Sequence, residues 1–259
     1  MKTHLSKLLG ISEERTNLLL LLYGGSRKKE TIQELLGISR QALVPHMKHL
    51  EENGLITKRN DAYELTSIGK IVLSEMMTFS ERLDFLDSNS DVLTKYKIDF
   101  IPPFLLERFH ELGPLSIREP HFLDVFEPDK EFMSTVSTSV SVIITFSFPA
   151  FRKFSSQIMD KGVDMHVILS QELLKKLIAE QYDDFKWFLE SEHSVVYLYS
   201  GKLDFVSFGL NESSIMFRLF DVVGDFDNNL ITASGQGAVE WGKEFFEYYK
   251  KRSTPVTEI

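Results

Sequence analysis

One stretch decides the fold of the N-terminal part of the chain: Ile38-Ser39-Arg40-Gln41-Ala42-Leu43-Val44-Pro45-His46-Met47-Lys48-His49-Leu50-Glu51-Glu52-Asn53-Gly54-Leu55-Ile56. Ser39 is a good N-cap and Asn53-Gly54 is a typical helix end, so we predict a helix over residues 40–52. Leu43, Met47 and Leu50 recur at i, i+4 and i+7 and should face inward. The opposite face should carry Arg40, Gln41, Val44, Pro45 and Lys48, with His46 and His49 toward its edges.

Two further helices are predicted upstream. The first covers residues 13–23, with Ser12 as its N-cap and Gly24-Gly25 at its end, and its five leucines (residues 18–22) indicate burial on several sides. The second is a short amphipathic helix over residues 28–36, which Gly37 ends. Two helices joined by a short turn that contains glycine form the helix-turn-helix arrangement.

Downstream of Gly54 the hydrophobic period changes from that of a helix to that of a strand. Residues 55–59 and 62–66 flank Asn60-Asp61, which predicts a hairpin with Lys58 and Arg59 at its tip. A hairpin beside a helix-turn-helix is a wing. A further helix should begin at Thr66 and run to about Leu86.

These elements suggest contacts with double-stranded DNA. Arg40 and Gln41 can offer bidentate hydrogen bonds to base edges, and lysine and arginine suit phosphates. The hydroxyl of Ser39, or the amides at the helix N-terminus, can also meet a phosphate. The candidate DNA-binding residues are Ser39, Arg40, Gln41, Val44, Pro45, His46, Lys48, Lys58 and Arg59. The alternative for each cation is an ordinary solvated face. Pro45 removes a backbone hydrogen bond and should kink the helix.

The N-terminal motifs resemble a known superfamily. The pieces His46-x-Lys48-x-Leu50-Glu51-x-x-Gly54-Leu55-Ile56 and Leu65-Thr66-x-x-Gly69 are similar to those of the winged-helix domains of ArsR-like regulators. The resemblance implies that the second helix of the motif enters the major groove and that the wing touches the DNA backbone.

Charge is distributed unevenly along the chain, whose net charge is −9. Residues 1–70 hold eleven Lys and Arg against eight Asp and Glu, a net charge of +3, whereas the remaining residues carry −12. An acidic body repels DNA and leaves the N-terminal part as the contact face.

The chain has no cysteine, no long apolar run and no signal-peptide pattern, so we expect a cytoplasmic protein without a membrane partner.

The polar segment 87–91 is interpreted as a linker between a domain at residues 1–86 and a mixed α/β domain at residues 92–259. In the second domain, helix 102–112 precedes strand 140–146, helix 149–161, strand 163–169 and helix 171–180. This alternation predicts a βαβ unit with parallel strands. Residues 194–199, 205–210 and 214–220 read as antiparallel strands, followed by a loop at 221–229 and a helix at 236–252. The fold class is therefore α+β/α/β.

The second domain resembles that of predicted archaeal transcription regulators best known from methanogens. The resemblance is carried by Gly224-Asp225-Phe226-Asp227 and by Ala238-x-x-Trp241-Gly242-x-x-x-Phe245-Phe246-x-x-Tyr249. It implies a sensor domain. The strand–helix–strand pattern is also similar to degenerate phospholipase-D-like domains. Their catalytic His-x-Lys-x4-Asp motif is missing, because the one His-x-Lys, at His46 and Lys48, has Asn53 where the Asp should be.

Candidate ligand-binding residues are Asp164 and His166, which alternate on one strand, and Arg218, which lies in an apolar strand. Arg218 suggests an anion pocket, because a charge among apolar residues normally needs a partner. A strand end that faces solvent is the alternative for the first two, and a structural ion pair with a nearby acid (Asp221, Asp225 or Asp227) is the alternative for Arg218. Scattered histidines without cysteine predict no metal site.

The sequence therefore predicts a regulator that binds DNA as a homodimer and senses a small-molecule effector, with no catalytic residues and no cofactor. The leucine-rich helix at residues 13–23 and the helix after Thr66 are the expected dimer interface, and the alternative is that both pack within their own domain. The alternative is a winged-helix module that docks a partner protein and is fused to an enzyme domain.

Overall fold

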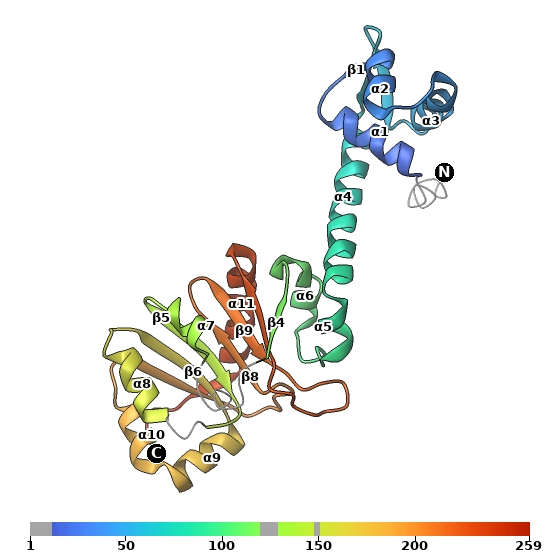
Figure 1. Cartoon of the computed structure of the whole chain (residues 1–259). Coiled ribbons are helices and arrows are strands. Elements are labelled where there is room, and N and C mark those ends of the chain that lie inside the picture. Colours follow the sequence, from blue (N-terminus) through green and yellow to red (C-terminus); the bar gives the residue numbers. More distant parts are fainter. Residues whose placement is uncertain (1–11, 120–128, 148–150) are drawn as a thin grey trace. The chain divides into compact units, whose positions relative to one another are not determined.

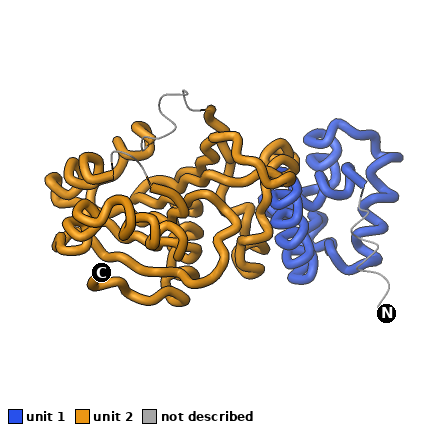
Figure 2. The backbone as a smooth tube through the Cα atoms, turned by 90° about the horizontal axis from the view of Figure 1, so that it is seen from below, with its two compact units in different colours: residues 1–84 blue, residues 85–259 orange. Residues whose placement is uncertain are grey.

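The computed structural model describes residues 12–119, 129–147 and 151–259 (Figure 1). Its contacts divide the chain into two units, one up to Asp84 and one from Phe85 to Ile259 (Figure 2). Both units mix helices with a sheet, as expected for an α+β protein. None of the helices in the described ranges is long and apolar enough to cross a membrane.

Over its described residues, unit 1 combines helices with a small antiparallel sheet of order β1-β3-β2, and the last of these helices continues past Asp84 into unit 2. The helices are α1 (Glu13–Tyr23), α2 (Lys29–Leu36), α3 (Arg40–Glu52) and α4 (Ser67–Ser88), and the strands are β1 (Arg27–Lys28), β2 (Ile56–Arg59) and β3 (Ala62–Leu65). Leucines of α1, α3 and α4 share one apolar core with Ile32 of α2 and Ile56 of β2. The burial predicted for the leucines of α1 holds for Leu18, Leu19 and Leu22 and is wrong for Leu20, which is 43% exposed.

The predicted bounds of α3 are confirmed. The hydroxyl oxygen of Ser39 accepts a hydrogen bond from the backbone N–H of Ala42 at 3.3 Å, which is the capping contact expected of this residue. Gly37 adopts φ 64°, a left-handed conformation that ends α2. Ser12 precedes α1 with the backbone of an N-cap, but its side chain makes no capping hydrogen bond.

The predicted hairpin is also confirmed. Asn60 and Asp61 have φ of 46° and 62°, and the residues flanking them, Arg59 and Ala62, pair directly. Two central residues with positive φ form the tight turn that matches the twist of a two-stranded ribbon. The third strand, β1, was not predicted, and it pairs with β3 on the side away from β2.

The Leu65-Thr66-x-x-Gly69 motif joins this hairpin to α4. The hydroxyl of Thr66 donates to the carbonyl of Gly54 at 2.6 Å and accepts from the N–H of Gly69 at 2.9 Å. A Cβ at position 69 would lie 2.0 Å from the carbonyl oxygen of Leu55. Glycine is therefore required where α4 passes the strand.

Unit 2 is built on an eight-stranded sheet of order β11-β7-β6-β5-β8-β9-β10-β4. Its strands are β4 (Ser116–Arg118), β5 (Ser139–Ile144), β6 (Asp164–Ser170), β7 (Ser194–Tyr199), β8 (Ser207–Leu210), β9 (Ser214–Arg218), β10 (Leu230–Ser234) and β11 (Ser253–Pro255). Strands β5, β6 and β7 are parallel, which confirms the predicted βαβ unit, and the other pairings are antiparallel.

Each face of the sheet has its own apolar core. On one face α11 (Gln236–Lys250) packs Trp241, Phe245 and Tyr249 against strand residues, together with α5 (Ser90–Lys95), α6 (Pro103–Leu106) and the 3-10 helix η2 (Phe109–Leu112). The indole N–H of Trp241 donates to the carbonyl of Leu105 at 3.0 Å. The other face is covered by α7 (Lys130–Ser134), α8 (Phe151–Met159), α9 (Gln171–Glu180) and α10 (Tyr182–Leu189).

Several sequence-based expectations for unit 2 are wrong. The helix expected over residues 102–112 is two pieces, α6 and η2, and β7 runs parallel to β6 instead of antiparallel. Segment 87–91, interpreted as a linker, forms the end of α4 and the start of α5, with Asn89 buried between them. Strands β4, β10 and β11 and helix α10 were not predicted. Pro149, the expected start of the helix that contains α8, lies outside the described residues.

Candidate nucleic-acid interface

Helix α3 has one buried face and one exposed face. Leu43, Met47 and Leu50 are at most 3% exposed, as their spacing predicted. The residues expected on the opposite face are all exposed; they are Arg40, Gln41, Val44, Pro45 and Lys48. His46 and His49 are half-buried, consistent with positions at the edges of that face. The outer face thus presents two cations, an amide and two apolar side chains to solvent.

Helix α3 is capped by Ser39 at its N-terminus and contains Pro45 in its second turn. The oxygen of Ser39 is engaged with Ala42, while its hydroxyl proton is free to be donated to an anion. Pro45 has no N–H, so the carbonyl of Gln41 loses its usual partner four residues on. The helix nevertheless runs as one element from Arg40 to Glu52.

Three of the candidate DNA-binding residues, Lys48, Lys58 and Arg59, are cations that are each paired with a carboxylate. Nζ of Lys48 lies 3.7 Å from Oε1 of Glu52, and Nε of Arg59 lies 3.3 Å from Oε1 of Glu64. Lys58 contacts Asp61 at 2.7 Å, and this hydrogen bond raises the pKa of Lys58 and lowers that of Asp61. Exposed pairs of this kind contribute little to stability, so a phosphate can replace the carboxylate.

Two cations beside the hairpin were missed at the level of sequence. In β1, Arg27 pairs with Tyr63 and Lys28 pairs with Ala62, which is also the partner of Arg59 in β2. Strand β1 therefore adds positive charge next to the hairpin. Within the described ranges neither Arg27 nor Lys28 has an ion-pair partner. A strand of two residues has no hydrophobic period that could reveal it.

The candidate ligand residues do not come together. Asp164 and His166 lie on one face of β6, where Oδ1 of Asp164 is 2.8 Å from Nδ1 of His193. Burial lowers the pKa of His166, and nearby Lys250 acts in the same direction. Arg218 lies on the other face of the sheet, is 3% exposed and lines a cavity with Met165 and Val167.

The acids near Arg218 in sequence have other partners. The carboxylate of Asp227 accepts hydrogen bonds from Lys95 and from the hydroxyl of Tyr96, each at 2.7 Å. Asp221 accepts from three backbone N–H groups of its own loop. Over the part of the chain that the structure describes, no group of three His, Asp or Glu side chains is arranged to hold a metal ion.

Two family models match the chain. Residues 125–252 match the middle domain of methanogenesis regulatory protein FilR1, and residues 4–87 match the HVO_A0261 N-terminal domain. The methanogenesis regulatory protein FilR1 of Methanothrix harundinacea (strain 6Ac) is 25% identical over 260 residues, which cover 97% of this chain and 58% of the relative. The chain thus spans less than two thirds of the length of that relative.

Two solved structures show weaker likeness. TrmBL2, described as an archaeal chromatin protein with a novel mode of DNA binding, aligns at 14% identity and a TM-score of 0.44, over 99% of this chain and 100% of that one. Phosphatidylserine synthase from Haemophilus influenzae Rd KW20 aligns at 10% identity and a TM-score of 0.38, over 86% of this chain and 49% of the other. Both scores are low, so neither likeness supports an inference about function.

Proposed function

We propose that the chain is a transcription regulator that binds double-stranded DNA through a winged helix-turn-helix, since residues 125–252 match the middle domain of methanogenesis regulatory protein FilR1 and that relative is 25% identical to this chain. Helices α2 and α3 form the helix-turn-helix, and the β2–β3 hairpin is the wing. The observation that carries the proposal is the outer face of α3, where Arg40, Gln41 and Lys48 are exposed above a fully apolar inner face.

Base reading and phosphate binding fall to different residues in this proposal. Arg40 and Gln41, in the first turn of α3, have the donors and acceptors that read base edges in the major groove. Lys48, Lys58 and Arg59 exchange their carboxylate partners for phosphates, and Lys28 adds to the same contact. Val44 supplies an apolar contact, while Ser39, Pro45 and His46 flank the contacting turn.

Salt dependence tests this proposal. Binding of the full chain to random duplex DNA is measured by fluorescence anisotropy over a series of salt concentrations. A dimer that displaces counterions from phosphates should give a log–log slope on the order of several negative units. The double variant Lys48→Ala/Arg59→Ala should flatten the slope. A flat slope for the unaltered protein contradicts DNA binding by this surface.

A matched control is available in unit 2. Lys176 and Lys186 are exposed and lie in i,i+4 pairs with Glu180 and Glu190, as Lys48 does with Glu52. The variant Lys176→Ala/Lys186→Ala removes the same charge and should keep the slope of the unaltered protein. Equal flattening by both double variants would point to net charge rather than to the winged helix.

We also propose that the regulator is a homodimer that associates through α4. This helix leaves Ile68, Ile71, Phe79 and Leu83 between 43% and 64% exposed, whereas α1 buries most of its leucines in its own core. Light scattering at micromolar concentration should give twice the 29.9 kDa chain mass, and Ile71→Glu/Phe79→Glu should give the monomer. A monomer for the unaltered protein contradicts this interface.

Unit 2 is proposed to be a sensor for a small-molecule effector and not an enzyme. It lacks the His-x-Lys-x4-Asp motif of active phospholipase-D-like domains, to which its strand–helix–strand pattern is similar. Addition of the effector should change the affinity of the full chain for DNA without chemical change to the effector, which mass spectrometry of the recovered ligand checks.

A further inference from the structure

We propose that a cavity in unit 2 binds a small molecule with one carboxylate and an apolar body. The binding site stands on the geometry of the cavity alone. The role of its ligand as the effector rests on the proposed function as a regulator.

The cavity lies between the sheet and two of its covering helices. Its floor is formed by residues of β5, β6, β8 and β9, and its wall by Phe132 and Met133 of α7 and by Phe151 and Phe154 of α8. Its volume is about 60 Å³, which admits about four water-sized groups. A ligand of this size is far smaller than a nucleotide.

Arg218 is the cation of this cavity. It is 3% exposed, and within the described ranges it has no carboxylate within ion-pair distance. Burial lowers the pKa of Arg218, because the charged guanidinium is removed from water, while the charge of nearby Asp129 acts in the opposite direction. A buried cation with no carboxylate in direct contact is costly, so the site favours an anion.

A second polar group of the cavity lies beside Arg218. Ser207 is 4% exposed, and its buried Oγ has no hydrogen-bond partner among the described residues. Ser207 in β8 is the direct register partner of Arg218 in β9, so both side chains project from the same face of the sheet. A hydroxyl and a guanidinium side by side can both donate to the oxygens of one carboxylate.

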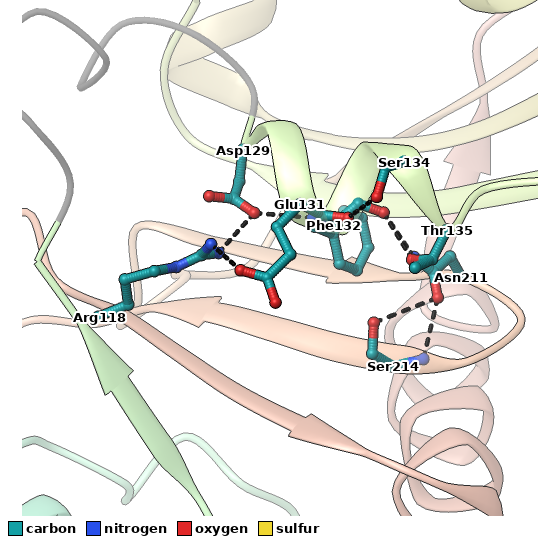
Figure 3. Close-up of polar contacts among 8 residues, drawn as sticks. All are labelled: Arg118, Asp129, Glu131, Phe132, Ser134, Thr135, Asn211 and Ser214. Atoms are coloured by element: carbon teal, nitrogen blue, oxygen red, sulfur yellow. Dashed lines mark hydrogen bonds and ion pairs between the residues drawn. The ribbon is translucent and has the colours of Figure 1, made fainter.

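The acid that also lines the cavity, Asp129, is already engaged. Its Oδ1 lies 2.5 Å from Nη2 of Arg118 and accepts from the N–H of Phe132 at 2.8 Å (Figure 3). Asn211 donates to the carbonyl of Phe132 and to Thr135 at 2.9 and 2.8 Å, which holds α7 against the β8–β9 hairpin. The α7 part of the wall is therefore held in place by these contacts, and the direct ion-pair partner of Asp129 is Arg118 rather than Arg218.

The position in the sheet agrees with a ligand site. Ile144, the last residue of β5, is paired with Ser207 and also lines the cavity. The two donors thus lie at the carboxyl end of a parallel strand. In open α/β sheets, ligands bind outside the carboxyl ends of the parallel strands.

Calorimetric titration of the full chain without DNA tests the site. The probes are the short carboxylates acetate, propionate and butyrate, each compared with the alcohol of the same length. At least one carboxylate should bind, and at least tenfold more tightly than its alcohol. Arg218→Met should weaken that binding at least tenfold without lowering the melting temperature, because the variant removes an uncompensated charge.

Arg152→Met is the matched control. Arg152 lies on α8 between two cavity residues, but its guanidinium is exposed and pairs with Asp184 at 2.9 Å, so its loss should leave carboxylate binding unchanged. If Arg218→Met fails to fold, Ser207→Ala is the variant that tests the site, and it should weaken carboxylate binding several-fold. The proposal is overturned if no carboxylate binds, if the alcohols bind as well, or if both site variants bind like the unaltered protein.

The two proposals fail separately. Carboxylate binding is measured without DNA, so its absence leaves the salt slope of DNA binding unaffected. Conversely, a flat salt slope together with carboxylate binding would contradict the proposed DNA-binding function but support the proposed ligand site.

Discussion

Asn89 joins α4, α5 and the segment before β4 through a single buried amide. Its Nδ2 donates to the carbonyl of Phe85 at 2.7 Å, and its Oδ1 accepts from the N–H of Leu115 at 2.8 Å. Asn89→Ala removes both hydrogen bonds and leaves the part-buried N–H of Leu115 without this partner, so we expect a loss of about 1–3 kcal/mol in the free energy of unfolding. Urea denaturation measures this loss.

Asn17→Ala is the control for this prediction, because Asn17 is exposed on α1. It should change stability by no more than about 0.5 kcal/mol. Equal stabilities for the two variants would show that the amide of Asn89 is not needed at this junction.

Glu212 makes the stability of unit 2 depend on pH. Burial raises its pKa, but hydrogen bonds from Thr138 and the N–H of Ser139 outweigh this effect and lower the pKa from 4.5 to about 2. A lowered pKa in the folded state means that the ionised group stabilises the fold above pH 4.5 and that this contribution is lost as the pH falls toward 2.

The variant Glu212→Gln isolates this effect. The unaltered protein should be more stable than the variant at neutral pH, and the difference should shrink between pH 4.5 and 2. Urea denaturation at several pH values measures both proteins. A difference that is constant over this range would contradict the role of the ionised carboxylate.

At the scale of elements, the β2–β3 hairpin contains a carboxylate that competes with phosphate for one of its lysines. Asp61 occupies a left-handed position in the turn and pairs with Lys58. Asn tolerates this conformation as Asp does, so Asp61→Asn should keep the hairpin and free Lys58. We expect tighter DNA binding, because Lys58 no longer has to leave a carboxylate before it contacts a phosphate.

Glu190→Gln is the control for Asp61→Asn, since it removes one carboxylate from an exposed lysine pair in unit 2. It should leave the affinity for DNA unchanged. A decrease in DNA affinity on Asp61→Asn would contradict the place of Lys58 in the interface.

Elements with local signals were predictable from sequence and those with distant partners were not. The ends of α2 and α3 and the hairpin turn are determined by nearby residues, namely Gly37, Ser39 and Asn60-Asp61. In contrast, β4 and β11 have three residues each, and their pairing depends on strands far away in the chain. The predicted direction of β7 was wrong, since the helices between β6 and β7 form a crossover that permits a parallel return.

The candidate site was predictable to a similar extent. The helical period places Arg40, Gln41 and Lys48 on an exposed face, and the structure has them there. The sequence also marks Arg218 as a charge among apolar residues. Its neighbour Ser207 was not identified, because the register between β8 and β9 depends on pairing that one strand alone does not reveal.

At the scale of the molecule, the apolar cores of unit 1 and unit 2 are separate. We expect calorimetry to resolve two unfolding transitions, because chains with more than one core often depart from two-state behaviour. Leu43→Ala, a substitution in the core of unit 1, should lower the free energy of unfolding of unit 1 by about 2–5 kcal/mol. The transition of unit 2 should stay at its temperature. A single transition that shifts as a whole would contradict independent unfolding.

The borders of the eight-stranded sheet have a consequence for assembly. Both outermost strands, β4 and β11, are only three residues long, and β11 ends in Pro255, which has no N–H to donate. Edge strands this short, one of which ends in proline, offer an incoming chain almost no unpaired backbone on which to add a strand. Fibril growth by strand addition is thereby discouraged at high concentration, and contacts between copies are left to side chains on helices.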